Sequence, residues 1–218
     1  MDSFPNPIIL IGALTLLGLA PFIAILTTSF VKIVIVIHMV RSALGLQQAP
    51  PNLAINGLAI ILSMYVMAPV AMDSYEKFNT HNVSFDDIKN PALQDAVQDS
   101  FKPFEAFLLK HSNEQERNFF LQTTKKIWPK KYSETVSNTN LLILIPAFLV
   151  SELTSAFQIG FLLYLPFIII DLIISNILIS MGMIMVSPIV ISLPFKVLLF
   201  VLVDGWVRLL HGLILSYQ

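Results

Sequence analysis

The sequence contains no cysteine and few charged residues. The missing cysteines exclude disulfides, iron-sulfur clusters, thiolate zinc sites and redox chemistry by protein thiols. Charged residues make up only 12% of the 218-residue chain, and 13 basic against 14 acidic side chains give a net charge of -1, so no basic surface is expected to attract nucleic acid. Hydrophobic residues, in contrast, make up 56%, and the mean hydropathy is +0.76. This composition excludes an ordinary soluble enzyme and indicates a membrane protein.

The charges are concentrated in one internal segment. Residues 73–140 hold 19 of the 27 charged residues. The remaining 150 residues hold only Asp2, Lys32, Arg41, Glu152, Asp171, Lys196, Asp204 and Arg208. The pattern predicts an all-α polytopic membrane protein in three parts: an N-terminal membrane hairpin over residues 1–72, a small soluble helical insert over 73–140, and C-terminal membrane hairpins over 141–218.

The N-terminal part contains two apolar runs of spanning length. Residues 8–26 and 53–72 each supply about the 20 apolar residues that a membrane helix needs. Between them, residues 41–52 are expected to form a connection, because Gly45 and the Pro50-Pro51 pair disfavour a helix. No basic residue precedes the first run, so a cleaved signal peptide is not expected.

The C-terminal part is harder to divide. Residues 141–150 are too few to span alone, and either continue past Glu152 or form a buried helix. The apolar stretch 157–203 is too long and too often interrupted by proline for one straight helix, so we expect spans near 160–180 and 183–203, followed by a short amphipathic tail.

The insert has a helical pattern of apolar residues. One stripe at spacings of three and four predicts a helix face that is bent or restarted at Pro103, and it comprises Leu93, Val97, Phe101, Phe104 and Leu108. Ser112 and Gln115 fit a capping box for the next helix.

Charge gives conflicting indications of orientation. Arg41 in the short first connection favours a cytoplasmic loop and an external insert. A count of Lys125, Lys126, Lys130 and Lys131 before the third apolar stretch favours the opposite. The positive-inside rule, by which loops rich in lysine and arginine stay in the cytoplasm, is reliable for loops of up to about 60 residues, and the insert is slightly longer. We therefore give more weight to Arg41 and expect the insert outside the cytoplasm.

No catalytic, metal or nucleotide motif is present in the sequence. The four histidines are scattered without His-x-x-x-His spacing, and no glycine-rich phosphate loop occurs. We therefore expect no enzyme activity, cofactor or metal. The single deep aspartate, Asp171, leaves an intramembrane hydrolase as a weak alternative.

Isolated ionisable residues in apolar surroundings are costly and usually face a partner or water. We expect Lys196 to pair with Glu152 or Asp171, whereas a pair of Asp204 with Arg208 at helical i, i+4 spacing is the less favoured interpretation of those two residues. Lys32 and Arg208 are expected near membrane borders, where long basic side chains reach water.

Methionines cluster before Pro188, at Met181, Met183 and Met185. Flexible side chains of this kind pack against surfaces of varying shape, so a ring of them could close a pore by excluding water. The alternative is that they fill an apolar core.

Two sets of motifs resemble the SctR/FliP family of type III secretion export-gate proteins. The first comprises TSFVKI at 28–33, which contains Lys32, RSALGLQQAPPN at 41–52, which contains Arg41, Pro50, Pro51 and Asn52, and NGLA at 56–59. The second comprises FQIGF at 157–161, LPF at 165–167, DL at 171–172, MGM at 181–183, SP at 187–188, LPFK at 193–196 and DGW at 204–206, which contains Asp204 and Trp206.

The resemblance implies a core subunit of a bacterial export apparatus in the inner membrane. In such an apparatus, several copies in a pentamer-like ring join SctS-like and SctT-like subunits, and unfolded substrate proteins pass through the middle. The insert would lie on the periplasmic side. The apolar segments would be bent hairpins, buried largely against neighbouring subunits.

The resemblance also implies roles for individual residues. Met183, Ile184 and Met185 match a gasket that seals the closed pore, although Ile184 is a stiffer side chain than the methionine common there. Lys196 would form an intersubunit salt bridge with Glu152.

Two alternatives to a virulence-type injectisome subunit stay open. A flagellar export subunit shares the mechanism, but that branch usually has a signal sequence and a longer chain. A secondary transporter would use Asp171 and Lys196 as a coupling pair at the midplane.

Overall fold

The computed structural model describes residues 7–81, 91–183 and 185–218, and in these ranges it contains α-helices and no strand. The helices are α1 (Pro7–Leu26), α2 (Phe30–Ala43), α3 (Asn52–Thr80), α4 (Pro91–His111), α5 (Glu114–Ile127), α6 (Lys130–Ser133), α7 (Leu141–Ser180), α8 (Pro188–Leu202) and α9 (Gly205–Leu215). The predicted all-α class is confirmed.

The first apolar region forms two helices. The chain bends by 60° between α1 and α2. Hydroxyl groups cluster at this bend, where Ser29 donates to Ser63 of α3 at 3.1 Å and Ser63 donates to Thr28 at 3.2 Å. The side-chain hydrogen bonds fix the bend against α3. Because one face of α2 is buried against α7, much of α2 belongs to the core.

The connection between α2 and α3 is closed by Arg41. Its Nη1 atom donates to the Pro50 carbonyl at 3.1 Å and to Asn52 Oδ1 at 2.6 Å. The peptide bond before Pro50 is cis, and Pro51 occupies the N-cap position of α3. α3 then continues to Thr80, through the expected boundary at residue 72.

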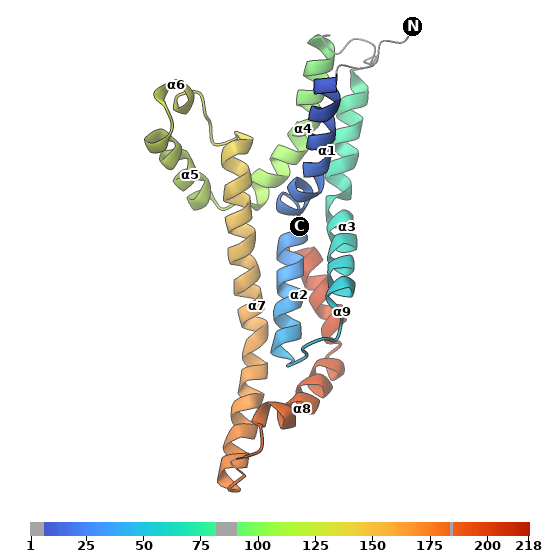
Figure 1. The fold of residues 1–218 in the computed structure, drawn as a ribbon, viewed down its shortest axis with the longest axis vertical. Helices are drawn as coiled ribbons and strands as arrows, with labels where there is room; N and C mark the ends of the chain where they lie inside the picture. The colour runs from blue at the N-terminus through green and yellow to red at the C-terminus, as the bar shows by residue number, and fades with distance from the viewer. Residues whose placement is uncertain (1–6, 82–90, 184) are drawn as a thin grey trace.

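The insert packs against the rest of the chain. α4 lies along α3 and contacts α7, while α5 packs on α7 (Figure 1). The predicted stripe is wrong in part: Val97 and Phe101 are exposed, whereas Ala96 and Phe107 are buried. The reason is that α4 meets two helices, which shifts its buried face. Pro103 lies inside α4 without ending it.

The predicted cap of α5 is wrong by one residue. The Asn113 side chain, rather than that of Ser112, accepts a hydrogen bond from the Gln115 N–H at 3.0 Å. Ser112 instead accepts hydrogen bonds from Arg117. Asparagine is as good a cap as serine, so the neighbouring residue could take the role.

α7 is one helix of 40 residues that contains Pro146 and Pro166. The short run 141–150 continues past Glu152 into the expected span at 160–180. Gly160 allows α2 to approach closely, because a Cβ atom there would collide with the Met39 sulfur. At about 1.5 Å per residue, α7 is about 60 Å long.

The chain reverses after α7 and returns towards the middle of the molecule (Figure 1). The expected span at 183–203 is shorter, because α8 begins only at Pro188 and a bend of 61° separates it from α9. Asp204 adopts a left-handed backbone with φ of 53° at the bend. Leu209 and Leu213 of α9 join the core cluster around α2.

Among the described residues, α3 and α7 are long and apolar enough to cross a membrane, and up to four spans result if each bent helix pair counts as one. This confirms the polytopic architecture. Large apolar side chains such as Phe22, Ile61, Leu162 and Leu202 are exposed on the isolated chain. A large part of the surface is therefore suited to lipid or to neighbouring subunits.

Candidate functional site

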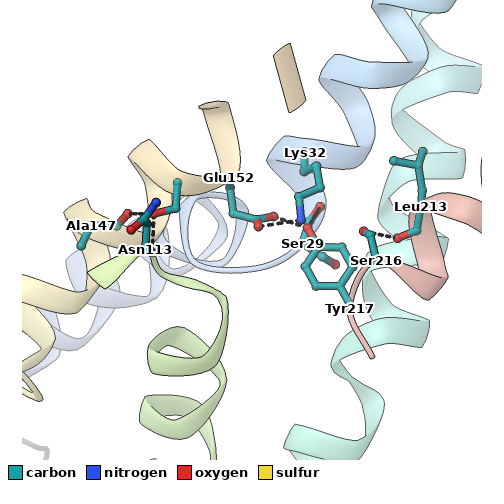
Figure 2. A network of polar contacts seen from close by, with 9 residues as sticks. Ser29, Lys32, Asn113, Ala147, Glu152, Leu213, Ser216 and Tyr217 are labelled. Atoms are coloured by element: carbon teal, nitrogen blue, oxygen red, sulfur yellow. Dashed lines mark hydrogen bonds and ion pairs between the residues drawn. The ribbon is translucent and has the colours of Figure 1, made fainter. Parts of the chain in front are cut away.

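Two ion pairs connect the long helix α7 to other helices. In the first, Lys32 Nζ on α2 lies 2.8 Å from Glu152 Oε1, and the side chains are only 5% and 2% exposed. The Tyr217 hydroxyl, near the C-terminus, donates to Glu152 Oε2 (Figure 2). The Lys32 ammonium also lies 4.1 Å from the centroid of the Tyr217 ring. Both carboxylate oxygens therefore have partners, as a buried charge requires.

Tyr217 also joins this pair to the insert. Its ring lies 5.1 Å from that of His111 and 6.2 Å from that of Phe107, both on α4. Burial lowers the pKa of His111 to about 4, and the positive charges of Lys110 and Lys32 act in the same direction. His111 is therefore neutral at physiological pH and packs as an aromatic ring.

The second ion pair connects α7 to α8. Lys196 Nζ lies 2.6 Å from Asp171 Oδ2, with exposed fractions of 4% and 31%. The ammonium group also donates to the Ala43 carbonyl at the end of α2, at 3.2 Å. Ser192 donates to the other Asp171 oxygen. Lys196 therefore joins three helices.

The structure brings some predicted site residues together and separates others. Lys196 meets Asp171, which was one of its two candidate partners, and Glu152 meets Lys32 within the same chain. The expectation that Lys32 reaches water is wrong, because α7 and Tyr217 enclose it. Sequence spacing carries no signal for the Lys32–Glu152 contact. The only indication is that each is an isolated charge in an apolar run.

The residues at the bend between α8 and α9 have mainly backbone and packing contacts. The Arg208 N–H donates to the Asp204 carbonyl at 3.1 Å, but their side chains form no ion pair within the described ranges. The structure therefore does not support the alternative of an Asp204–Arg208 pair, and both side chains are exposed. Trp206 packs edge-on against Phe200 with ring centroids 5.3 Å apart.

The methionine turn, defined as residues 181–187, connects α7 to α8 at the far end of the molecule (Figure 1). Met181, Met183 and Met185 are 67%, 41% and 100% exposed, so they do not fill a core in the isolated chain. Gly182 has φ of 75°, which a glycine adopts without strain. Pro188 begins α8. Ile184, the remaining predicted gasket residue, lies outside the described residues.

No group of three or more potential metal ligands occurs in the part of the chain that the structure describes. The candidate site consists of the two ion pairs and the exposed methionine turn.

Comparison with known proteins decides the family. The sequence model of the FliP family matches residues 13–213, which include both ion pairs and the methionine turn. The chain belongs to the FliP family. Because the match runs from α1 into α9, membership covers the whole helical arrangement described above.

FliP-family relatives match over their full length. The Yop proteins translocation protein R of Yersinia pestis is 53% identical over 217 residues, covering 100% of this chain and 99% of the relative. The virulence protein YscR of Salmonella typhimurium is 45% identical over 99% of this chain and 100% of the relative. The hypersensitivity response secretion protein HrcR of Ralstonia nicotianae is 43% identical over 99% of this chain and 98% of the relative. This chain is thus a component of a secretion apparatus. Its helices of spanning length indicate an inner-membrane protein.

Proposed function

We propose that this chain, a core subunit of the type III secretion export apparatus, forms the export pore and its gate together with further copies of itself and SctS-like and SctT-like subunits. Unfolded proteins are the substrates. The observation that carries the proposal is the exposed methionine turn at the end of an apolar helical hairpin. Exposed methionines are suited to an opening whose contents change shape, because their side chains are flexible and apolar.

The gate consists of Met183, Ile184 and Met185, repeated from each copy around the pore. In the closed state these side chains exclude water, and a passing polypeptide displaces them. Met185 is 100% exposed, so the described part of its own chain does not cover this side chain. The position of Ile184 in this gate rests on the sequence alone.

The ion pairs hold the hairpins that carry the gate. Lys196 joins α8 to α7 and α2 on one side of the turn, and Lys32 joins α2 to α7 further along the helix. Intersubunit contacts then form on the exposed apolar faces. The protein acts without a catalytic centre or cofactor of its own, and energy comes from its partners.

The insert lies on the periplasmic side of the inner membrane in this proposal. Arg41 supports that orientation, since it is a basic residue in the last turn of α2, next to the short connection to α3, and two hydrogen bonds hold its side chain across that connection. Virulence and hypersensitivity names among the relatives support an injectisome rather than a flagellum.

A secondary transporter is a second candidate because of one observation. The Asp171–Lys196 pair lies between apolar helices, yet the Asp171 side chain is 31% exposed and therefore accessible to water or to a small solute. A transporter of this kind moves a small solute when it is reconstituted alone, whereas a gate subunit is inert without its partners.

Native mass spectrometry of the detergent-extracted protein, co-expressed with its genomic neighbours, tests the proposal. We expect a ring-like oligomer that contains small hydrophobic partner subunits. The double variant Met183→Ala, Met185→Ala serves as a matched control and should assemble equally well, since these side chains lie outside the packed helices. A stable monomer or dimer that ignores the neighbours would overturn the proposal and favour the transporter.

A further inference from the structure

The methionine turn places oxidisable side chains at the surface of the chain (Figure 1). Met181 and Met185 are 67% and 100% exposed, and Met183 is 41% exposed. Three of the eight methionines in the sequence thus lie within five residues. The sequence has no cysteine, so methionines are the side chains of this chain that a peroxide oxidises most readily. The turn is therefore the densest group of accessible targets for such an oxidant.

Backbone hydrogen bonds hold the methionine turn in a defined conformation. The Gly182 N–H donates to the Ile179 carbonyl at 3.0 Å, and the Met183 N–H donates to the Leu178 carbonyl at 2.9 Å. Together with the positive φ of Gly182, these two bonds form a Schellman motif, which satisfies the last carbonyl groups of a helix. The end of α7 thus fixes where the methionines lie, and every copy of the chain presents them in the same way.

Oxidation changes a methionine from a flexible apolar side chain into a polar one. The thioether sulfur attacks one oxygen of hydrogen peroxide, the O–O bond breaks, an S–O bond forms and water leaves. The sulfur loses two electrons, and the peroxide gains them. The sulfoxide oxygen accepts hydrogen bonds, so it is costly to enclose where no donor is present.

We propose that Met183 and Met185 form a modification site for peroxide, and that their oxidation to sulfoxide opens the gate. The closed gate excludes water by apolar contact, whereas sulfoxides at the same positions bind water. This effect rests on the proposed function, because only side chains that close a pore can change the flow through it. Methionine sulfoxide reductases restore the thioether with two electrons and two protons from thiols, and release water. The modification is therefore reversible.

Peptide mass spectrometry of the assembled complex shows which methionines gain an oxygen atom during brief treatment with hydrogen peroxide. We expect Met185 to be oxidised first and Met183 next, because susceptibility follows exposure. Both should react severalfold faster than Met39, which is half-buried beside Gly160 between α2 and α7. This measurement does not depend on whether the pore conducts.

Ion flux into vesicles that contain the assembled complex gives the functional readout. The flux should rise about tenfold after oxidation, the factor expected from desolvating one polar group in the closed state. It should fall again after treatment with the two reductases that act on the two sulfoxide epimers. Met183→Leu with Met185→Leu should remove the rise, since leucine has a similar volume and no sulfur. The matched control, Met64→Leu with Met72→Leu, removes two exposed methionines of α3 and should keep the rise.

The proposal would be overturned by any of three results. Met185 could be oxidised no faster than Met39, the rise could survive the two leucine substitutions at the turn, or both sulfoxides could form without a change in flux. Met183→Ala with Met185→Ala separates the last result from a failure of the gate itself. Flux that rises with the alanines and not with the sulfoxides overturns the modification site alone, whereas flux unchanged by either contradicts the proposed gate as well.

Discussion

Lys32 and Glu152 are 120 positions apart in the sequence, yet their side chains meet at 2.8 Å between α2 and α7 and are almost completely buried. Tyr217 completes the contact from the C-terminal end of the chain. Three segments from the beginning, middle and end of the sequence thus converge on one carboxylate. This contact explains how a helix as long as α7 is held in place beside α2.

Neutralising one member of this pair should strongly destabilise the protein. Glu152→Gln or Lys32→Met leaves the other charge buried without its partner, which typically costs about 3–5 kcal/mol. The double variant should lose less than the sum of the two single losses, because no charge is left unpaired. Denaturant unfolding in detergent micelles measures the free energy of unfolding of the two single variants and the double variant. Arg208→Met, at an exposed position, is the control and should be close to neutral. Additive losses would contradict a direct pair.

Reversal of the charge at Lys196 should reduce the amount of assembled complex, and reversal at Asp171 should restore part of it. Lys196→Glu places two carboxylates together, and Asp171→Lys recreates an attractive pair. Recovery is incomplete because a glutamate at 196 cannot donate to the Ala43 carbonyl. Native gels of the extracted complex give the readout. The combination of Lys196→Glu with Glu152→Lys is the control. If that combination restored the complex and the first did not, Glu152 of another subunit would be the true partner.

Acid should destabilise the contact between the insert and the C-terminus. Burial lowers the pKa of His111 from 6.5 to about 4, so the unfolded chain binds more protons than the native protein between these values. The contribution of His111 to stability is therefore complete above about pH 6.5 and is lost as the pH falls towards 4. Thermal unfolding across this range should show the decline.

The variant His111→Gln separates this effect from that of the insert's other groups. Hydrogen bonds from Lys102 and His81 lower the pKa of Asp99 below 3.8. Protonation of Asp99 therefore affects stability only at a more acidic pH. We expect the variant to have a smaller dependence on pH between about 6.5 and 4 than the parent. An unchanged dependence would show that His111 is not the responsible group.

Shortening the gate methionines should make the closed assembly permeable. Met183→Ala with Met185→Ala removes the flexible side chains proposed to exclude water from the pore. Ion flux into vesicles that contain the assembled complex should rise above that of the parent. Met72→Ala, a change at an exposed methionine of α3, should leave the vesicles tight. A double variant as tight as the parent would rule out the gasket.

The sequence predicts the fold class well because composition and run length suffice for it. Apolar runs separated by one charged segment predict membrane helices, whatever their partners. It does not predict the length of α7, because Pro146 and Pro166 are local signals for a break, and packing against α2 and the neighbouring helices overrides them. It also misses the start of α8 at Pro188, since the apolar character continues through the turn.

The candidate site could be predicted only in part. The pairing of Lys196 with Asp171 was one of two alternatives, since both are isolated charges within the same apolar stretch. The partner of Lys32 depends on how α2 lies against α7 and on Tyr217, and neither relation leaves a pattern at short spacing. The face of α4 was misjudged for the same reason, because two neighbouring helices share its burial.

Crosslinking to a substrate in transit tests the central claim most directly. A photoreactive amino acid replaces Met185, and an export substrate is stalled by fusion to a tightly folded domain. The account predicts a light-dependent adduct between this chain and the stalled substrate. The same amino acid at Tyr75, exposed on α3, should give none. Normal export of the unfused substrate, combined with no adduct from position 185 or an equal adduct from position 75, would contradict the account.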